Sequence, residues 1–172
     1  MLTICFHGAE STGKTTFAES LAGELACTWV PEYGRTFAET RGTDFSMGDL
    51  LAIAEGQDAA RRAAAQAERR LLILDTDPLM TAAWAQMLFG TVPQSLLDYP
   101  KGDFYILFAP DMPWIADGTR FFGAPGDRKR FADFSEAMLD RAGVPYQRIT
   151  GDWDQRRAAA RAILQERLTE TM

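Results

Sequence analysis

The chain has 172 residues, of which 47% are hydrophobic and 24% are charged, and its formal net charge is −6. This length suits one domain over residues 1–172, and the acidic balance excludes a broad basic surface for a nucleic-acid partner. No apolar run approaches the roughly 20 residues of a membrane span, and the absence of a basic leader and the reduced thiols expected at Cys5 and Cys27 indicate a cytoplasmic protein.

A glycine-rich motif follows the first predicted strand. Leu2–Phe6 is short, apolar and rich in β-forming residues, and residues 8–16 then read GAESTGKTT. This is the Gly-x-x-x-x-Gly-Lys-Thr pattern of a P-loop, whose backbone N–H groups form an anion nest. Apolar residues then recur at helical spacing and predict a helix from about Lys14 to Ala26. A strand before the motif and a helix after it favour a P-loop over a plain turn.

The motif predicts a site for ATP with Mg²⁺. Lys14 is expected on the β/γ-phosphate oxygens and Thr15 on the cation, and the following helix adds the positive end of its dipole. His7 directly precedes the motif and is expected to be structural rather than a general base. The loop residues predicted to bind ATP are Gly8, Glu10, Ser11, Thr12, Gly13, Lys14, Thr15 and Thr16.

A second strand is predicted over Thr28–Pro31, with the proline at its end because it lacks a backbone N–H. Glu32–Arg35 then follows as a turn at the carboxyl end of this strand. In open α/β sheets such positions face the ligand crevice, so this turn is a candidate part of the site.

The longest predicted helix covers residues 46–69, with Ser46 as its cap. Gly56 interrupts it at a cost of about 1 kcal/mol relative to alanine, which indicates the close approach of another group. Gln57 is either a polar neighbour of that group or a solvated helix residue.

Leu71–Asp75 is a continuous apolar run that ends in an acid, typical of a buried central strand. Its carboxyl end is where a Mg²⁺-binding carboxylate belongs, which assigns Asp75 to the metal together with Thr15. Asp77 is either a second functional carboxylate or the cap of the helix that starts at Pro78 and extends over residues 79–89.

The second half of the chain continues the alternation of strands and helices. Residues 90–102 are predicted as a surface connection, Phe104–Phe108 as the fourth strand and residues 145–149 as the fifth, and a final helix includes Trp153.

A cationic cluster lies between the last two strands, next to the glycine-rich segment 123–126. It consists of Arg120, Arg128, Lys129 and Arg130. Such a cluster suits a mobile lid that closes over phosphate, with Arg120 in a catalytic role and Arg128 on ATP. The alternative is a solvated face of the helix that includes Phe131.

Five strands alternating with helices predict an α/β P-loop NTPase sandwich of three layers. The expected sheet is parallel and five-stranded, with helices on both faces and a small lid. The P-loop, the lid and the small size indicate a small-molecule kinase, and the Asn-Lys-x-Asp motif of a GTPase is absent.

A specific resemblance rests on four motifs that occur in order: GAESTGKTT at 8–16, EYGR at 32–35, LDTD at 74–77 and DMPWIADGTR at 111–120. Together they resemble the ribosylnicotinamide kinase domain at the C-terminus of bacterial NadR proteins, over nearly the whole chain. The resemblance implies transfer of the ATP γ-phosphate to the 5′-hydroxyl of nicotinamide riboside, which gives nicotinamide mononucleotide.

The acceptor site is assigned from residues near the predicted strand ends. Glu32 is the first choice to position or deprotonate the acceptor hydroxyl, with Asp77 as the reserve. Tyr33 and Trp114 are predicted to stack on the nicotinamide ring, unless they are core aromatics. The remaining assignments are ribose hydroxyls for Asp117, and phosphate or acceptor for Arg35 and Arg120.

Two alternatives stay open. One is a P-loop kinase of another nucleoside or small metabolite, and the other is a regulatory ATPase that hydrolyses ATP slowly and responds to a protein partner.

Overall fold

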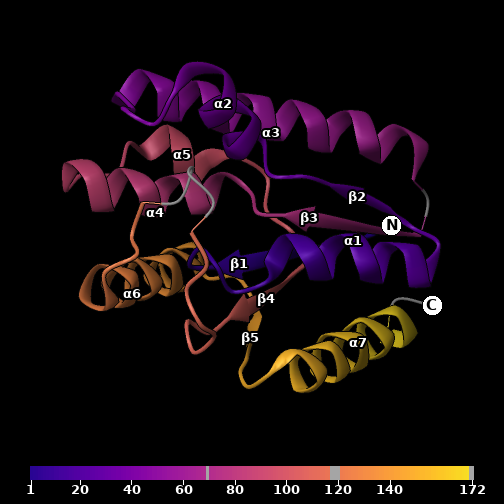
Figure 1. The fold of residues 1–172 in the computed structure, drawn as a ribbon. Helices are drawn as coiled ribbons and strands as arrows, with labels where there is room; N and C mark the ends of the chain where they lie inside the picture. The colour runs from indigo at the N-terminus through magenta and orange to yellow at the C-terminus, as the bar shows by residue number, and fades with distance from the viewer. Residues whose placement is uncertain (69, 117–120, 171–172) are drawn as a thin grey trace.

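The computed structural model describes residues 1–68, 70–116 and 121–170. Its strands form one parallel sheet in the order β2-β3-β1-β4-β5, with β1 (Leu2–Gly8) at the centre (Figure 1). The others are β2 (Thr28–Val30), β3 (Leu71–Asp75), β4 (Phe104–Phe108) and β5 (Tyr146–Ile149). The predicted five-stranded parallel sheet is confirmed.

Helices cover both faces of this sheet, so the molecule has the three layers of the P-loop kinase fold (Figure 1). Helices α1 (Lys14–Leu25) and α7 (Trp153–Glu170) pack on one face, while α3 (Met47–Ala67), α4 (Pro78–Phe89) and α6 (Pro125–Ala142) pack on the other. The remaining helices are α2 (Tyr33–Arg41) and α5 (Gln94–Asp98). Among the described helices, none combines the length and apolar composition that crossing a membrane requires.

The core explains why the strands are continuous apolar runs. On one face Ile4 and Phe6 of β1 pack with Phe17 of α1 and with residues of α7, and all three side chains are at most 1% exposed. On the other face Cys5 packs in a cluster with residues of α3, α4 and α6. A strand covered on both faces has no solvated side, so the two-residue alternation disappears from its sequence.

Two helices replace predicted connections. The turn predicted over Glu32–Arg35 is wrong because α2 begins at Tyr33, and the connection over residues 90–102 contains α5. Helix α2 is short, is polar over most of its length and buries only Phe37 and Ala38, and α5 has 5 residues. Both are therefore shorter or more polar than the patterns that identify helices in a sequence.

The glycine-rich segment 123–126 beside the predicted lid is partly helical. Helix α6 begins at Pro125, and a proline suits the first helical position because that position needs no N–H partner. The second half of the glycine-rich segment therefore belongs to this helix. Residues 117–120, with Asp117 and Arg120, lie outside the described residues.

Candidate active site

The P-loop curls between β1 and α1 at the carboxyl edge of the sheet. Gly8 has a φ of 128°, and a Cβ there would lie 2.4 Å from the carbonyl oxygen of Phe108 on the neighbouring strand. Ser11 and Gly13 also have positive φ, of 57° and 93°. This sequence of conformations turns the loop back on itself and produces the nest geometry that the motif predicted.

Lys14 folds back over the loop instead of extending into solvent. The side chain is buried, and its Nζ donates to the carbonyl oxygen of Ala9 at 2.8 Å. The hydroxyl of Thr12 donates to the same carbonyl, also at 2.8 Å. The pocket around this loop is lined by all eight loop residues predicted to bind ATP, so the structure brings them together; Thr16 is exposed at its edge.

Thr15 and Asp75 meet beside Lys14, as the metal prediction requires. The pairing of β1 with β3 places Asp75 opposite Phe6, one strand from the loop. The Thr15 hydroxyl donates to Oδ2 of Asp75 at 2.5 Å. Within the described residues Oδ1 of this fully buried carboxylate has no hydrogen-bond partner. Burial raises the pKa of Asp75, and the Lys14 ammonium opposes that rise.

This arrangement fits a hard divalent cation. A buried carboxylate oxygen without a partner is costly, and a cation is the ligand that relieves it best. The adjacent hydroxyl of Thr15 supplies the second oxygen.

Asp77 is occupied by structural contacts. Its Oδ1 accepts from the backbone N–H of Leu79 at 2.9 Å, which makes it the cap of α4. Its Oδ2 accepts from the phenol of Tyr105. Burial raises the pKa of Asp77 to about 6. The cap is therefore the alternative that has contacts in the structure, while the substrate and catalytic roles assigned to Asp77 stay predictions.

We expect Tyr105→Phe to lower the free energy of unfolding at pH 7 by about 2 kcal/mol, because the buried carboxylate loses a donor. Urea titration would measure this free energy of unfolding. The control is Tyr146→Phe, which removes a hydroxyl that donates to the carboxylates of Glu136 and Asp140. The loss should be smaller at pH 4, where Asp77, whose pKa is about 6, is protonated. Equal losses at both pH values would contradict this account.

Glu32 lies at the N-terminus of α2, partly buried between the P-loop pocket and a second pocket. Burial and then the Asp75 carboxylate raise the pKa of Glu32 to about 7, with a smaller contribution from Glu10, while Lys14 and Arg35 oppose the rise. A carboxyl group with this pKa accepts a proton readily near neutral pH, which suits a general base.

A buried amide holds the junction between β2 and α2, which includes Glu32. Gln57 of α3 is 3% exposed, and its Oε1 accepts from the N–H of Tyr33 at 2.7 Å. Its Nε2 donates to the carbonyl oxygens of Pro31 and Thr76 at 3.3 and 3.4 Å. The alternative of a solvated Gln57 is wrong: the side chain ties the end of β2 to the end of β3.

Gly56 makes room for Tyr33, which confirms the predicted close approach of another group. A Cβ at Gly56 would lie 2.3 Å from the ring of Tyr33. That ring is 38% exposed and does not line the second pocket, so its stacking role stays a prediction.

Three aromatic rings line the second pocket. The ring centroids of Phe45 and Phe121 lie 5.6 Å apart, and that of Trp84 lies 6.2 and 5.1 Å from them. Glu10, Glu32 and Arg35 line the same pocket. No residue pattern predicted this aromatic cage, and its one signal in the sequence is a tryptophan on the predicted helix 79–89.

Glu10 links the aromatic cage to the P-loop. Its Oε2 accepts from the backbone N–H groups of Phe121 and Phe122 at 3.0 and 3.4 Å. A side chain predicted for ATP therefore also fixes the segment that contributes Phe121 to the second pocket.

Trp114 and Arg128 lie beside each other and line neither of the two pockets. The Arg128 guanidinium lies 5.7 Å from the Trp114 ring and donates to the carbonyl oxygens of Met112 and Ser11, at 2.5 and 3.0 Å. Trp114 does not line the aromatic pocket, and a Cβ at Gly123 would lie 3.0 Å from its indole nitrogen. Arg128 is buried against the outside of the P-loop, so both assigned roles stay predictions.

His7 has the structural character that the sequence predicted. It is fully buried, and Nε2 donates to the carbonyl oxygen of Ser135 at 3.0 Å. Burial lowers the pKa of His7 to about 3, which keeps the ring neutral. Cys5 and Cys27 are free thiols, as expected.

Comparison with known sequences confirms the predicted resemblance. A family model described as an AAA domain matches residues 3–156. The trifunctional NAD biosynthesis/regulator protein NadR of Escherichia coli is 30% identical over 176 residues, which span 98% of this chain and 43% of that protein. The chain thus covers less than half the length of this curated relative.

Solved structures show the same fold. NadR in complex with NR has a TM-score of 0.79 and 21% identity, and NadR with NAD and AMP-PNP has 0.75 and 20%; each match covers 96% of this chain and 49% of that one. Deoxyadenosine kinase from M. mycoides has a TM-score of 0.67 and 11% identity, with 96% and 100% covered.

Proposed function

Because this chain belongs to the AAA domain family over residues 3–156, we propose that it is a cytoplasmic P-loop kinase that phosphorylates nicotinamide riboside with ATP. The similarity to NadR supports a P-loop nucleoside kinase, and the two NadR structures contain NR or AMP-PNP. The riboside as acceptor is our proposal for this chain.

One observation carries the choice of acceptor: the P-loop pocket adjoins a pocket that is both aromatic and acidic. The two share Glu10, Glu32, Arg35, Met80 and Trp84. A phosphate group in the first pocket and a planar ring in the second would therefore be neighbours. The pyridinium of nicotinamide riboside is flat and cationic. Aromatic faces and two carboxylates, which outnumber the single guanidinium of Arg35, complement it, where a neutral base would gain only stacking.

The proposed reaction is an in-line phosphoryl transfer in which the protein positions the two substrates and neutralises the charge on the phosphates. Lys14 and the P-loop amides hold the β/γ-phosphates. Glu32 orients the 5′-hydroxyl and accepts its proton while the acceptor oxygen bonds to the γ-phosphorus and the bond to the ADP oxygen breaks. Thr15 and Asp75 would hold Mg²⁺, which supplies charge neutralisation at the phosphates when it is bound.

An ATP-consumption assay with Mg²⁺ against a panel of nucleosides tests the proposal, with the phosphorylated product identified by mass. We expect selective turnover of nicotinamide riboside and little hydrolysis without an acceptor. Turnover of a different nucleoside would show that the protein is a kinase with another acceptor than the one proposed. Hydrolysis that no acceptor stimulates would contradict the kinase and favour the regulatory ATPase.

The aromatic cage makes a separate prediction. We expect Trp84→Ala to raise KM for nicotinamide riboside about tenfold, because a cation loses its best aromatic face. Steady-state kinetics would measure this KM. Trp84→Phe keeps an aromatic face and should raise KM by less than Trp84→Ala. The control is Phe89→Ala, an exposed ring on the same helix.

A neutral acceptor isolates the contribution of the charge. Dihydronicotinamide riboside has nearly the same shape, but its ring carries no positive charge. The wild-type protein should prefer the oxidised riboside, and Trp84→Ala should reduce that preference. An equal loss for both acceptors would show that Trp84 acts by shape alone.

A further inference from the structure

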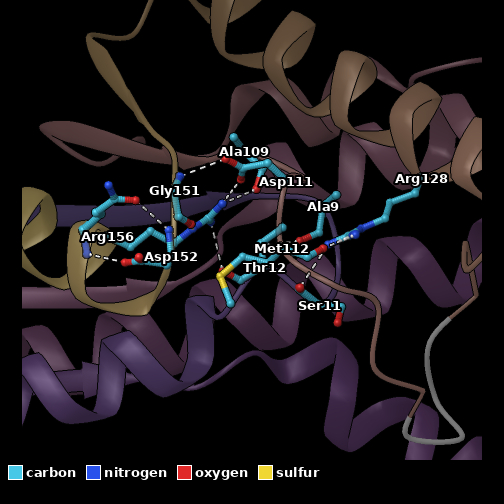
Figure 2. Close-up of polar contacts among 11 residues, drawn as sticks. Ala9, Ser11, Thr12, Ala109, Asp111, Met112, Arg128, Gly151, Asp152 and Arg156 are labelled. Carbon is cyan, nitrogen blue, oxygen red and sulfur yellow. Dashed lines mark hydrogen bonds and ion pairs between the residues drawn. The ribbon is translucent and has the colours of Figure 1, made fainter.

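An arginine outside the two pockets donates a hydrogen bond to the P-loop from the side opposite the P-loop pocket. Arg156 of α7 is 0% exposed, although arginine is among the residues least often buried. Its Nη1 donates to the carbonyl oxygen of Thr12 at 3.2 Å, inside the P-loop. Figure 2 shows the guanidinium inserted between that loop and two others at the same edge of the sheet.

The other contacts of Arg156 come from the segments that follow β4 and β5. Nη2 donates to the carbonyl oxygen of Ala109 at 2.9 Å and to the carboxylate of Asp111 (Figure 2). Nε donates to the carbonyl oxygen of Gly151 at 2.7 Å. The second oxygen of Asp111 accepts from the N–H of Gly151 at 2.8 Å, which closes a ring of contacts among the three segments. One side chain thus satisfies acceptors on three loops, and Asp111 compensates its charge.

The geometry of an anion nest explains why such a donor is needed. When successive N–H groups of a loop point inward to a phosphate, the carbonyls between them point outward and need donors of their own. Arg156 supplies the donor for Thr12, and Arg128 supplies one for Ser11 at 3.0 Å. Lys14 and Thr12 do the same for Ala9.

We propose that Arg156 is a positioning residue for the nucleotide site, which holds the P-loop in its phosphate-binding shape before a nucleotide arrives. The inference rests on the proposed binding of ATP at this loop and is independent of the acceptor. Arg156 touches no phosphate. It acts through the carbonyl of Thr12, and it locks this loop to the segments after β4 and β5, so that the inward amides need no reorganisation on binding.

The test compares Arg156→Met, which keeps the length of the side chain without its donors, with Arg157→Met. Arg157 is the next residue and pairs with Glu24 at the surface, 2.6 Å away. Titration calorimetry should give about tenfold weaker ATP binding for Arg156→Met and no change for Arg157→Met. KM for the acceptor should stay within about twofold, since Arg156 lines neither pocket.

Amide hydrogen exchange in the nucleotide-free protein gives a readout that a merely structural role would not move. In Arg156→Met the amides of residues 9–15 should exchange at least about tenfold faster, while those of β1 and β4 keep their protection. Faster exchange across the whole molecule, or unchanged exchange in the loop, would overturn the proposal. If the wild-type protein failed to bind ATP, the kinase proposal would fail, and the exchange data would still decide the role of Arg156.

A rescue experiment covers the case in which Arg156→Met folds poorly. Arg156→Ala leaves a buried space with the shape of the lost group, so millimolar guanidinium ion should restore part of the ATP affinity. Rescue by guanidinium but not by sodium at equal ionic strength would support positioning by the donors. Equal effects of both ions would contradict it.

Discussion

Replacing Lys14 by methionine should lower kcat/KM for ATP about a thousandfold, because the γ-phosphate loses its closest cation in a water-poor site. Lys14 is buried, and its Nζ already bonds to the carbonyl oxygen of Ala9 at 2.8 Å, within the loop that would surround the phosphates. A nucleotide therefore meets an ammonium group that is held in place, not one that must be recruited from solvent. Steady-state kinetics with saturating acceptor would measure the loss.

The control is Arg157→Met, which removes a cation outside both pockets. Arg157 pairs with Glu24 at the surface of α7, and its side chain is 49% exposed. Its removal should leave kcat/KM within about twofold of wild type. A Lys14→Met enzyme with more than a tenth of the wild-type activity would contradict the role given to the P-loop lysine, provided that its thermal unfolding matches that of the wild type.

Glu32→Gln should lower kcat about a hundredfold or more if Glu32 is the general base. The amide keeps the shape of the side chain and removes the group that accepts the proton. In the wild-type enzyme kcat/KM should rise with pH through about 7, the pKa of Glu32, because only the ionised form acts as a base. The pH profile of the variant should lose this rise. Near-normal turnover would remove Glu32 from the role.

Although Glu32→Gln should lower activity, it should raise the stability of the folded protein. Burial and the neighbouring Asp75 raise the pKa of Glu32 from 4.5 to about 7 in the folded state. Between these values the folded protein binds more protons than the unfolded chain, so stability falls as pH rises across the window. Glu32→Gln removes this penalty and should raise Tm at pH 8 more than at pH 4.5. Scanning calorimetry at the two pH values would test the sign.

The five strands and the P-loop were predictable because their signals are local. A strand buried on both faces is a continuous apolar run, and Leu71–Asp75 and Phe104–Phe108 match the structure at both ends. The contact between Thr15 and Asp75 also followed from local patterns, since both residues lie at the carboxyl edge of adjacent parallel strands.

The aromatic pocket was not predictable because its residues come from distant parts of the chain. Phe45 precedes α3, Trp84 lies on α4, and Phe121 follows β4. In its own segment none of the three has a pattern that indicates a binding site. Trp114 attracted the stacking prediction because it lies in a motif. In the structure its ring lies beside Arg128 and Gly123 and does not line the aromatic pocket, and its stacking role stays a prediction. Asp77 shows the converse: its place before a proline indicated a cap and its place after a strand indicated a functional carboxylate. Its contacts with Leu79 and Tyr105 show the cap, and the catalytic role stays a prediction.

The strand order β2-β3-β1-β4-β5 has an evolutionary consequence. Apart from Glu10, Glu32 and Phe121, the aromatic pocket draws its lining from residues 34–84, on the β2–β3 side. The arginines behind the P-loop come from α6 and α7, on the side of β4 and β5. Selection for a new acceptor can therefore act on one contiguous stretch of the gene while the P-loop itself is inherited unchanged. A library randomised at the positions within residues 34–84 that line only the aromatic pocket, with Asp75 and the shared residues Arg35, Met80 and Trp84 kept, is where a change of substrate preference should first emerge.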